Sequence, residues 1–375
     1  MEDDLPIDRG LEGVVVADST ISGVDGEGGR LIIRGHDIES LAREASVEGL
    51  CGLLWEGDDP DPDRHRRYQR QLAEARQRAF EGLEPMAPGL EPMAALRARL
   101  AGFQTRAQAP LEQAAELTGA CAVFAAADSR QRRGLEPIAP DTELNHAGDY
   151  LRMITGEHGP VAARVLGRYL VTVVDHGMNA STFTARVITS TDSDMVSAVV
   201  GAVGALKGPL HGGAPGPVLD MLDAVAREGD AERFLQRELS AGRRIMGMGH
   251  RVYRVRDPRA AVLEEAIQLL SPLRAGAPDG QPQAQGARLA VARRVEAAAA
   301  ALLRKQKPTR KLAANVEFYT AVLLDALGID RLDFSPTFAV GRVVGWCAHI
   351  LEQRQSGRLI RPRLRYVGPR PEIAA

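Results

Sequence analysis

Three histidines stand out because each interrupts an apolar stretch beside glycine. They are His176 in VVDHGMNAS, His211 in GPLHGGAP and His250 in GMGHRVYRVRDPRA. Glycine beside histidine permits a close backbone approach or a positive φ, and loops on a rigid scaffold are where sites collect. A structural turn histidine is an equally good interpretation of any one of them, but three such turns favour a site. By contrast, polar surroundings indicate a solvated His146, and the last predicted helix indicates a core His349.

Arginines supply a second component of a possible site. Arg254 and Arg259 follow His250 within nine residues, and Arg342 and Arg361 lie nearer the C-terminus. A guanidinium beside such a turn can bind a carboxylate or phosphate through two hydrogen bonds. The alternative for a run of arginines is a solvated charged face.

A single carboxylate, Glu317, lies among apolar neighbours in NVEFY, after a basic run over 305–311. Apolar surroundings raise the pKa of a carboxyl group, which produces a base that works near neutral pH. The alternative is a helix-starting glutamate stabilised by the helix dipole, and spacing alone favours that alternative.

Composition limits the classes of protein that can carry these residues. The chain has 375 residues, a formal charge of −2, a pI near 6.5 and 4% aromatic residues, which argues against nucleic-acid binding. Three scattered cysteines predict neither a disulfide framework nor a zinc site. The acidic N-terminus is unlike a signal peptide, and no apolar run reaches the roughly 18 residues of a membrane span. We therefore expect a soluble, cytoplasmic protein of about two domains that binds no membrane.

The elements that must position these residues are mostly helical. Apolar residues at 14–16 and 31–33 flank a Gly/Asp-rich turn and predict a small β hairpin near the N-terminus. Helical periodicity dominates afterwards, so the expected class is all-α. Helices are predicted from about 195 to 206, from 217, over 259–270, over 288–303, and from Ser335-Pro336 to about 355. Breaks are predicted at 57–66, 84–92, 132–141 and 271–286.

Six collinear segments make the chain resemble the citrate synthase family, and the citrate synthase 2 subgroup in particular. They are GLEGVVVADSTISGVDGEGGRLIIRGHDIESLA, DHGMNASTFTARV, GPLHGGAP, GMGHRVYRVRDPRA, NVEFYTAVLLDALGI and GRVVGWCAHILEQRQSGRLIRPR. The weakest match is 56–145. The resemblance implies an all-α homodimer whose large domain spans 1–212 and 320–375 and whose small domain spans 213–319. It also implies condensation of acetyl-CoA with oxaloacetate and water to citrate and CoA, in which CoA thioester is a substrate and neither a cofactor nor a metal is used.

The resemblance assigns catalytic roles to three matching residues. His211 would hydrogen-bond the thioester carbonyl, and His250 would polarise and protonate the oxaloacetate carbonyl. Glu317 stands where the family's common motif has a proton-abstracting aspartate. One additional methylene moves a carboxylate by about an ångström, and misplacement on that scale can cost roughly 10²-fold in rate. The subgroup shares this glutamate, which favours a compensating backbone.

Binding roles follow in the same way. Oxaloacetate is assigned to His176, Arg259 and Arg342, with Arg361 supplied by the partner subunit. The CoA adenine is assigned to a backbone loop formed by Ile245, Met246, Gly247, Met248 and Gly249. The CoA phosphates are assigned to Arg254 and a basic residue at Arg310 or Lys311.

Three alternatives remain open on the sequence alone. A 2-methylcitrate synthase would use propionyl-CoA, and one methylene is worth only about 1–3 kcal/mol of discrimination. A helical binding protein could have kept the fold and lost catalysis through the Glu317 substitution. A metal-dependent lyase could use His176, His211 and His250 as ligands, which would require three imidazoles within about 2.1 Å of one ion.

Overall fold

The structure is a computed structural model, and it describes nine stretches of the chain. They are residues 10–11, 13–57, 61–85, 89–157, 159–212, 215–249, 252–270, 281–306 and 313–369.

The elements are a small sheet followed by helices. The strands are β1 Ser22–Asp25, β2 Arg30–Ile33 and β3 His36–Asp37. The first helices are α1 Ile38–Glu44, α2 Val47–Glu56, α3 Pro62–Glu81, α4 Pro92–Gly102, α5 Pro110–Arg132, α6 His146–Thr155, α7 Pro160–Thr172, α8 Ala180–Thr189 and α9 Met195–Leu206. The later ones are α10 Pro215–Glu228, α11 Ala231–Ser240, α12 Pro258–Gln268, α13 Gln281–Gln306, α14 Val316–Ala326, the 3₁₀ helix η2 Arg331–Asp333 and α15 Phe334–Ser356. The prediction of an all-α fold with a small β element is confirmed.

The sheet is antiparallel in the order β1-β2-β3, and Ser22 pairs with Ile33 while Asp25 pairs with Arg30. The predicted first strand at 14–16 was wrong. Those valines are exposed, Val15 by 85%, and they pair with no strand. The turn sets the register instead, because Asp25 Oδ1 accepts the N–H groups of Glu27 and Gly28 and so closes a tight loop directly after Ser22–Asp25.

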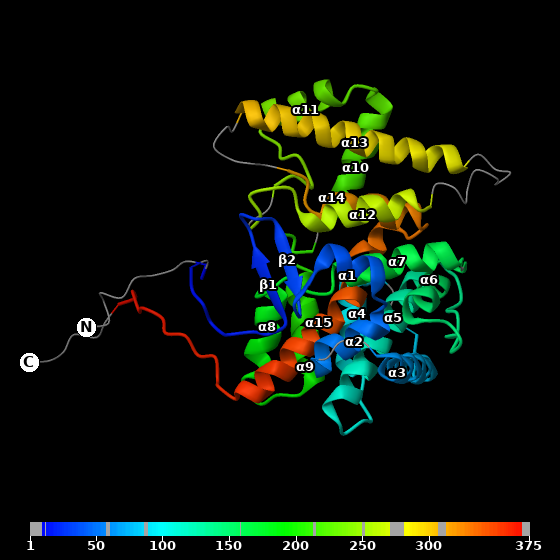
Figure 1. Ribbon diagram of the computed structural model, residues 1–375, viewed down its shortest axis with the longest axis vertical. Coiled ribbons are helices and arrows are strands. Elements are labelled where there is room, and N and C mark those ends of the chain that lie inside the picture. The colour runs from blue at the N-terminus through cyan, green and yellow to red at the C-terminus, as the bar shows by residue number, and fades with distance from the viewer. Residues whose placement is uncertain are drawn as a thin grey trace, which may run out of the picture.

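The helices form a larger body and a smaller layer above it (Figure 1). The body contains α1–α9 and α15, and the upper layer contains α10–α14. The β1–β2 hairpin rises from the body toward the upper layer. The boundary expected at 319/320 falls inside α14, which runs from Val316 to Ala326.

Helix α15 lies at the centre of the body and contacts α2, α5, α7, α8 and α9. Two of its glycines allow this close packing. A Cβ at Gly341 would meet Val173 Cγ2 at 2.6 Å, and one at Gly345 would collide with the Val174 carbonyl oxygen. Because both glycines face the segment after α7, that segment is held directly against α15.

Most predicted helices are present, but several ends differ. The helix expected from 217 begins at Pro215, and the one expected over 259–270 runs from Pro258 to Gln268. The break predicted at 271–286 was wrong over 281–286, where α13 has already begun, and residues 271–280 lie outside the described part. The break at 57–66 was also too long, because Asp61 caps α3 and Pro62 occupies its first turn.

Over the part of the chain that the structure describes, every helix is too short or too polar to cross a membrane.

Candidate active site

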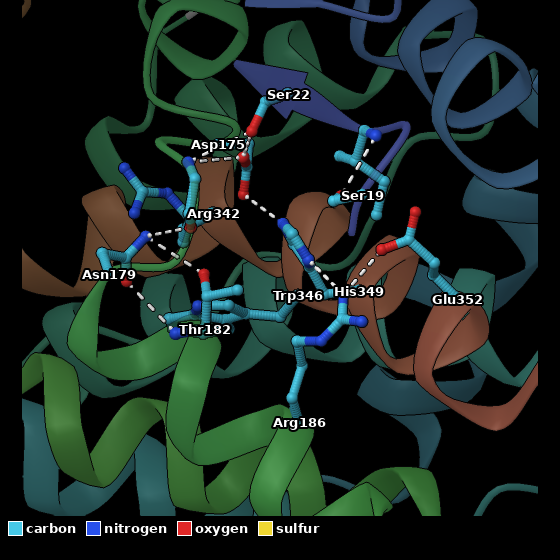
Figure 2. Close-up of polar contacts among 12 residues, drawn as sticks. Ser19, Ser22, Asp175, Asn179, Thr182, Arg186, Arg342, Trp346, His349 and Glu352 are labelled. Atoms are coloured by element: carbon cyan, nitrogen blue, oxygen red, sulfur yellow. Dashed lines mark hydrogen bonds and ion pairs between the residues drawn. The ribbon is translucent and has the colours of Figure 1, made fainter. Parts of the chain in front are cut away.

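The turn between α7 and α8 carries His176 and is fixed by a buried carboxylate (Figure 2). Asp175 Oδ2 accepts the N–H of Gly177 at 2.9 Å and also bonds the Ser22 hydroxyl of β1. His176 is half-buried, and its Nε2 lies 3.2 Å from the hydroxyl of Tyr253. The turn therefore has its orientation set from both sides, by the hairpin and by α15.

His349 of α15 holds the other oxygen of Asp175. Its Nε2 lies 3.1 Å from Asp175 Oδ1, and Arg186 Nη1 donates to its Nδ1 at 3.0 Å. A guanidinium can only donate, so Nδ1 must accept and Nε2 must carry the proton. The side chain is 1% exposed, which confirms the prediction of a satisfied core histidine.

His211 follows α9 and contacts the start of α8. Its Nε2 lies 2.8 Å from Ser181 Oγ, which also accepts the indole N–H of Trp346 at 3.1 Å. Burial, with a smaller contribution from the nearby Arg342 charge, lowers the pKa of His211 to about 4. The imidazole is therefore neutral at pH 7 and available as a hydrogen-bond donor.

Ser181, Trp346 and Asn179 were not identified from the sequence. Asn179 caps α8 by accepting the N–H groups of Ser181 and Thr182, each at 3.1 Å. Asn at a helix start is a recognisable capping signal and could have located this turn. No local signal could have joined Ser181 to Trp346, because 165 residues separate them.

Glu317 lies in the first turn of α14, and the start of that helix is held by several hydrogen bonds. Asn315 Oδ1 accepts the N–H of Glu317 at 3.1 Å, and Asn315 Nδ2 donates to the carbonyl of Gly249 at 2.9 Å. Asp257 Oδ2 accepts the N–H of Val316 at 3.2 Å. The helix-start interpretation of Glu317 is therefore correct for its backbone.

The Glu317 carboxyl group itself is not used by the helix. Its Oε2 is buried and has no hydrogen-bond partner among the described residues. Burial raises the pKa of Glu317 to about 7, although the charges of Arg259 and Arg342 oppose the shift. A buried, unbonded carboxyl that titrates near neutrality is a candidate general base.

Two buried arginines lie within electrostatic range of Glu317. Arg259 forms a two-bond ion pair with Asp257, at 3.0 and 2.7 Å. Arg342 donates from Nε to the carbonyl of Val173 and has no ion pair among the described residues. Burial lowers the pKa of Arg342 to about 10, which leaves it charged. Arg342 is therefore a buried cation that has no carboxylate at ion-pair distance among the described residues.

The segment assigned to CoA packs against the start of α14. Met248 pairs with Ala314, and Gly249 N donates to the Ala313 carbonyl at 2.7 Å. Gly247 has a φ of +72°, and a Cβ there would meet Phe318 at 2.9 Å. Ile245 and Met246 precede this contact, with Ile245 buried. Arg254 follows it with its side chain 58% exposed.

Four other predicted residues have no described contact with this site. His250, Arg310 and Lys311 fall outside the described residues. Arg361 is exposed and forms no hydrogen bond or ion pair with the described part of this chain.

The prediction of a solvated His146 was wrong. The side chain is fully buried, and its Nδ1 lies 3.3 Å from the Nη1 of the fully buried Arg76. Polar neighbours in the sequence failed as a guide because they cap and start α6, whose first residue points into the core.

Among the described residues, which leave out His250, no three His, Cys, Asp or Glu side chains gather to hold a metal ion. His176 and His211 lie within hydrogen-bond distance of hydroxyl groups, of Tyr253 and Ser181 respectively.

Together these features describe a mainly helical protein in which Glu317, with a pKa near 7, lies within electrostatic range of Arg259 and Arg342, and Arg342 in turn lies within electrostatic range of His211. Comparison with known proteins agrees with this class. The family profile described as "Citrate synthase, C-terminal domain" matches residues 10–363, and the chain belongs to the citrate synthase family.

Relatives match over nearly the full chain. A citrate synthase of Haloferax volcanii is 39% identical to this chain, and the alignment covers 96% of this chain and 95% of the relative. Citrate synthase 2 of Bacillus subtilis is 37% identical, and the alignment covers 96% of each chain. A solved ternary complex of carboxymethyl coenzyme A and oxaloacetate with citrate synthase from Thermoplasma acidophilum has a TM-score of 0.86 at 25% identity, covering 99% of this chain and 98% of that one.

Proposed function

We propose that this protein condenses acetyl-CoA with oxaloacetate and water to give citrate and CoA. The observation that carries the proposal is the Glu317 carboxyl, which has a pKa near 7, a buried oxygen with no hydrogen bond to the described residues, and two arginines within electrostatic range. Thioester methyl protons are very weakly acidic, so their removal needs a positioned base and a donor at the carbonyl oxygen at the same moment.

Enol formation is the first step. The Glu317 carboxylate takes a methyl proton, and the C–H electron pair forms the enol double bond. His211 stabilises the carbonyl oxygen by donating from Nδ1, which requires Nε2 to accept the Ser181 hydroxyl proton. In the structure the Ser181 hydroxyl donates to Asn179 Oδ1 at 2.8 Å, so it must turn toward His211 Nε2, and Asn179 Oδ1 then still accepts two backbone N–H groups.

Carbon–carbon bond formation follows. Arg259 and Arg342 bind the oxaloacetate carboxylates together with His176, and two-bond guanidinium contacts fix the orientation of the ketone. The enol carbon attacks the ketone carbon, and His250 delivers a proton to the new alkoxide. Water then attacks the thioester, the C–S bond breaks, and the CoA thiol leaves with a proton.

Domain closure keeps water out until that last step. We assign residues 213–319 to a small domain that moves over 1–212 and 320–375. Support comes from the two layers in Figure 1 and from the site, whose His211 and Arg342 lie in the lower body and whose Arg259 and Glu317 begin helices of the upper layer.

A homodimer completes the site in this proposal. The chain after α15 is extended and exposed, with Leu359 exposed by 57% and Leu364 by 84%. Such a tail suits a contact with a second copy, to whose oxaloacetate it would bring Arg361. Cytoplasmic location stays a prediction.

Release of the CoA thiol tests the activity directly. We expect acetyl-CoA to release the thiol only when oxaloacetate is present. A chelator should leave the rate unchanged, and Glu317→Gln should abolish it. Faster turnover with propionyl-CoA would identify a 2-methylcitrate synthase instead. No turnover with either thioester, despite retained binding, would favour the non-catalytic alternative, and loss of activity with the chelator would favour the metal-dependent one.

A further inference from the structure

The turn between β1 and β2 contacts the segment that follows His250. The Gly26 carbonyl accepts the backbone N–H of Arg254 at 2.8 Å. The turn is itself rigid, because Asp25 Oδ1 accepts the N–H groups of Glu27 and Gly28 at 3.1 and 2.8 Å. Because the turn is rigid and accepts the N–H of Arg254, it fixes the Arg254 backbone relative to the larger body.

The contact is too close for any side chain at Gly26. A Cβ there would lie 3.1 Å from both the carbonyl carbon and Cγ1 of Val252, and closer than 3.0 Å to the Val252 carbonyl oxygen. Gly29, at the other end of the turn, approaches the Val255 side chain just as closely. The turn and the 252–255 backbone therefore fit each other without space for an additional methyl group.

The opposite side of this segment is also held. Arg256 donates to Glu296 of α13 at 2.8 and 3.1 Å and to Glu264 of α12 at 2.9 Å. The backbone of Arg254 thus lies between the hairpin and the upper layer. Its guanidinium remains accessible, since the side chain is 58% exposed and the Glu27 carboxylate lies only at the limit of an ion pair, 4.0 Å away.

The base of the same hairpin contacts the oxaloacetate turn. Ser22 bonds Asp175, and Val24 Cγ2 lies 3.4 Å from where a Cβ of Gly177 would be. One hairpin therefore connects the turn that carries His176 with the segment that carries Arg254, although these lie in different layers of the fold.

We infer that the β1–β2 turn is a positioning element for CoA, in which Gly26 holds the Arg254 backbone and so directs its guanidinium toward a CoA phosphate. The inference rests on the proposed function, since it takes Arg254 as a phosphate contact. It adds Gly26 as a positioning residue that touches no substrate itself.

Gly26→Ala tests the inference, with Gly23→Ala as its matched control. The φ of Gly26 is outside the left-handed region, so alanine adds a clash without backbone strain, and a Cβ at Gly23 on β1 would meet nothing within 4 Å. We expect Gly26→Ala to raise the KM for acetyl-CoA and the Kd for CoA about tenfold, as loss of one charged hydrogen bond would. The KM for oxaloacetate should stay unchanged, and Gly23→Ala should match wild type.

A double-mutant cycle with Arg254→Gln gives the readout that a general packing defect would not produce. If Gly26 acts through Arg254, the double variant should bind CoA no more weakly than Arg254→Gln alone. Full additivity, an unchanged Kd in Gly26→Ala, or equal losses for both substrates would each overturn the inference. The Kd is measured by calorimetry with CoA and does not depend on turnover. The inference about Gly26 can therefore fail while wild-type turnover supports the proposed function, and it can hold when turnover is absent.

Discussion

At the scale of single residues, burial moves the pKa values of the two acid–base groups in opposite directions. The pKa of Glu317 rises to about 7 and that of His211 falls to about 4, because in both cases the charged form loses its hydration. Only deprotonated Glu317 can act as base. We therefore expect log kcat/KM to rise with unit slope toward about pH 7 and then level off. A profile that is flat from about pH 5 to about pH 9 would contradict this role.

The raised pKa of Glu317 also predicts how the free energy of unfolding depends on pH. The ordinary pKa of a glutamate is near 4.5, so between about 4.5 and 7 the native state binds more protons at Glu317 than the unfolded state does. The contribution of this residue to stability therefore falls as pH rises through that window. We expect Glu317→Gln to be more stable than wild type by about 3 kcal/mol at pH 8, and equal to it near pH 4. Urea unfolding at both values tests this, and a less stable variant at pH 8 would show that the carboxylate is well solvated.

The length of the Glu317 side chain gives a separate prediction. Restoring the common aspartate with Glu317→Asp withdraws the carboxyl by about an ångström, and the backbone at Asn315 and Gly249 fixes where the helix starts. We expect kcat to fall roughly 10²-fold while the KM for oxaloacetate is unchanged. Steady-state kinetics decide, and an aspartate variant as fast as wild type would mean that the site is not adjusted to glutamate.

At the scale of elements, one carboxylate joins β1, α15 and the turn before α8. In Asp175→Asn the amide oxygen can still accept hydrogen bonds from Ser22 and Gly177, but the amide N–H₂ must then face the Nε2–H of His349. Because Arg186 donates to Nδ1, the imidazole cannot move its proton from Nε2 to Nδ1, and two donors face each other. We expect a loss of about 3 kcal/mol in the free energy of unfolding. Adding Arg186→Met should cost less than the sum of the single variants, whereas strict additivity would exclude this locked tautomer.

Particular elements show which parts of the fold and of the candidate site could be predicted from the sequence. Helix starts were readable where a capping residue marks them, as at Asp194 before α9. The first strand was misplaced because a run of three valines indicates β propensity but not pairing, which the Asp25 turn decides. The site residues came from family motifs, whereas Ser181 and Trp346 came from contacts between distant segments, which no local pattern encodes.

At the scale of the whole molecule, the proposed site combines residues from the body with residues from the upper layer. His211 and Arg342 belong to the body, Glu317 and Arg259 begin helices of the upper layer, and the hairpin contacts both (Figure 1). Interactions across that boundary include the ion pair of Arg43 in α1 with Glu265 in α12, at 2.8 Å. Closure and binding should therefore be coupled, because any substrate that touches both layers favours the closed arrangement.

The proposed homodimer, with Arg361 supplied by the partner subunit, can be tested by one coexpression experiment. Glu317→Gln and Arg361→Gln should each be nearly inactive as homodimers. In a mixed dimer, the subunit with Arg361→Gln keeps its own Glu317 and receives Arg361 from the partner, so one of its two sites is intact. Random assortment makes about half of the dimers mixed, so we expect coexpressed chains to recover about a quarter of wild-type activity. If Arg361 served the site of its own chain, every site would lack one group, and the coexpressed preparation would stay as inactive as its parents.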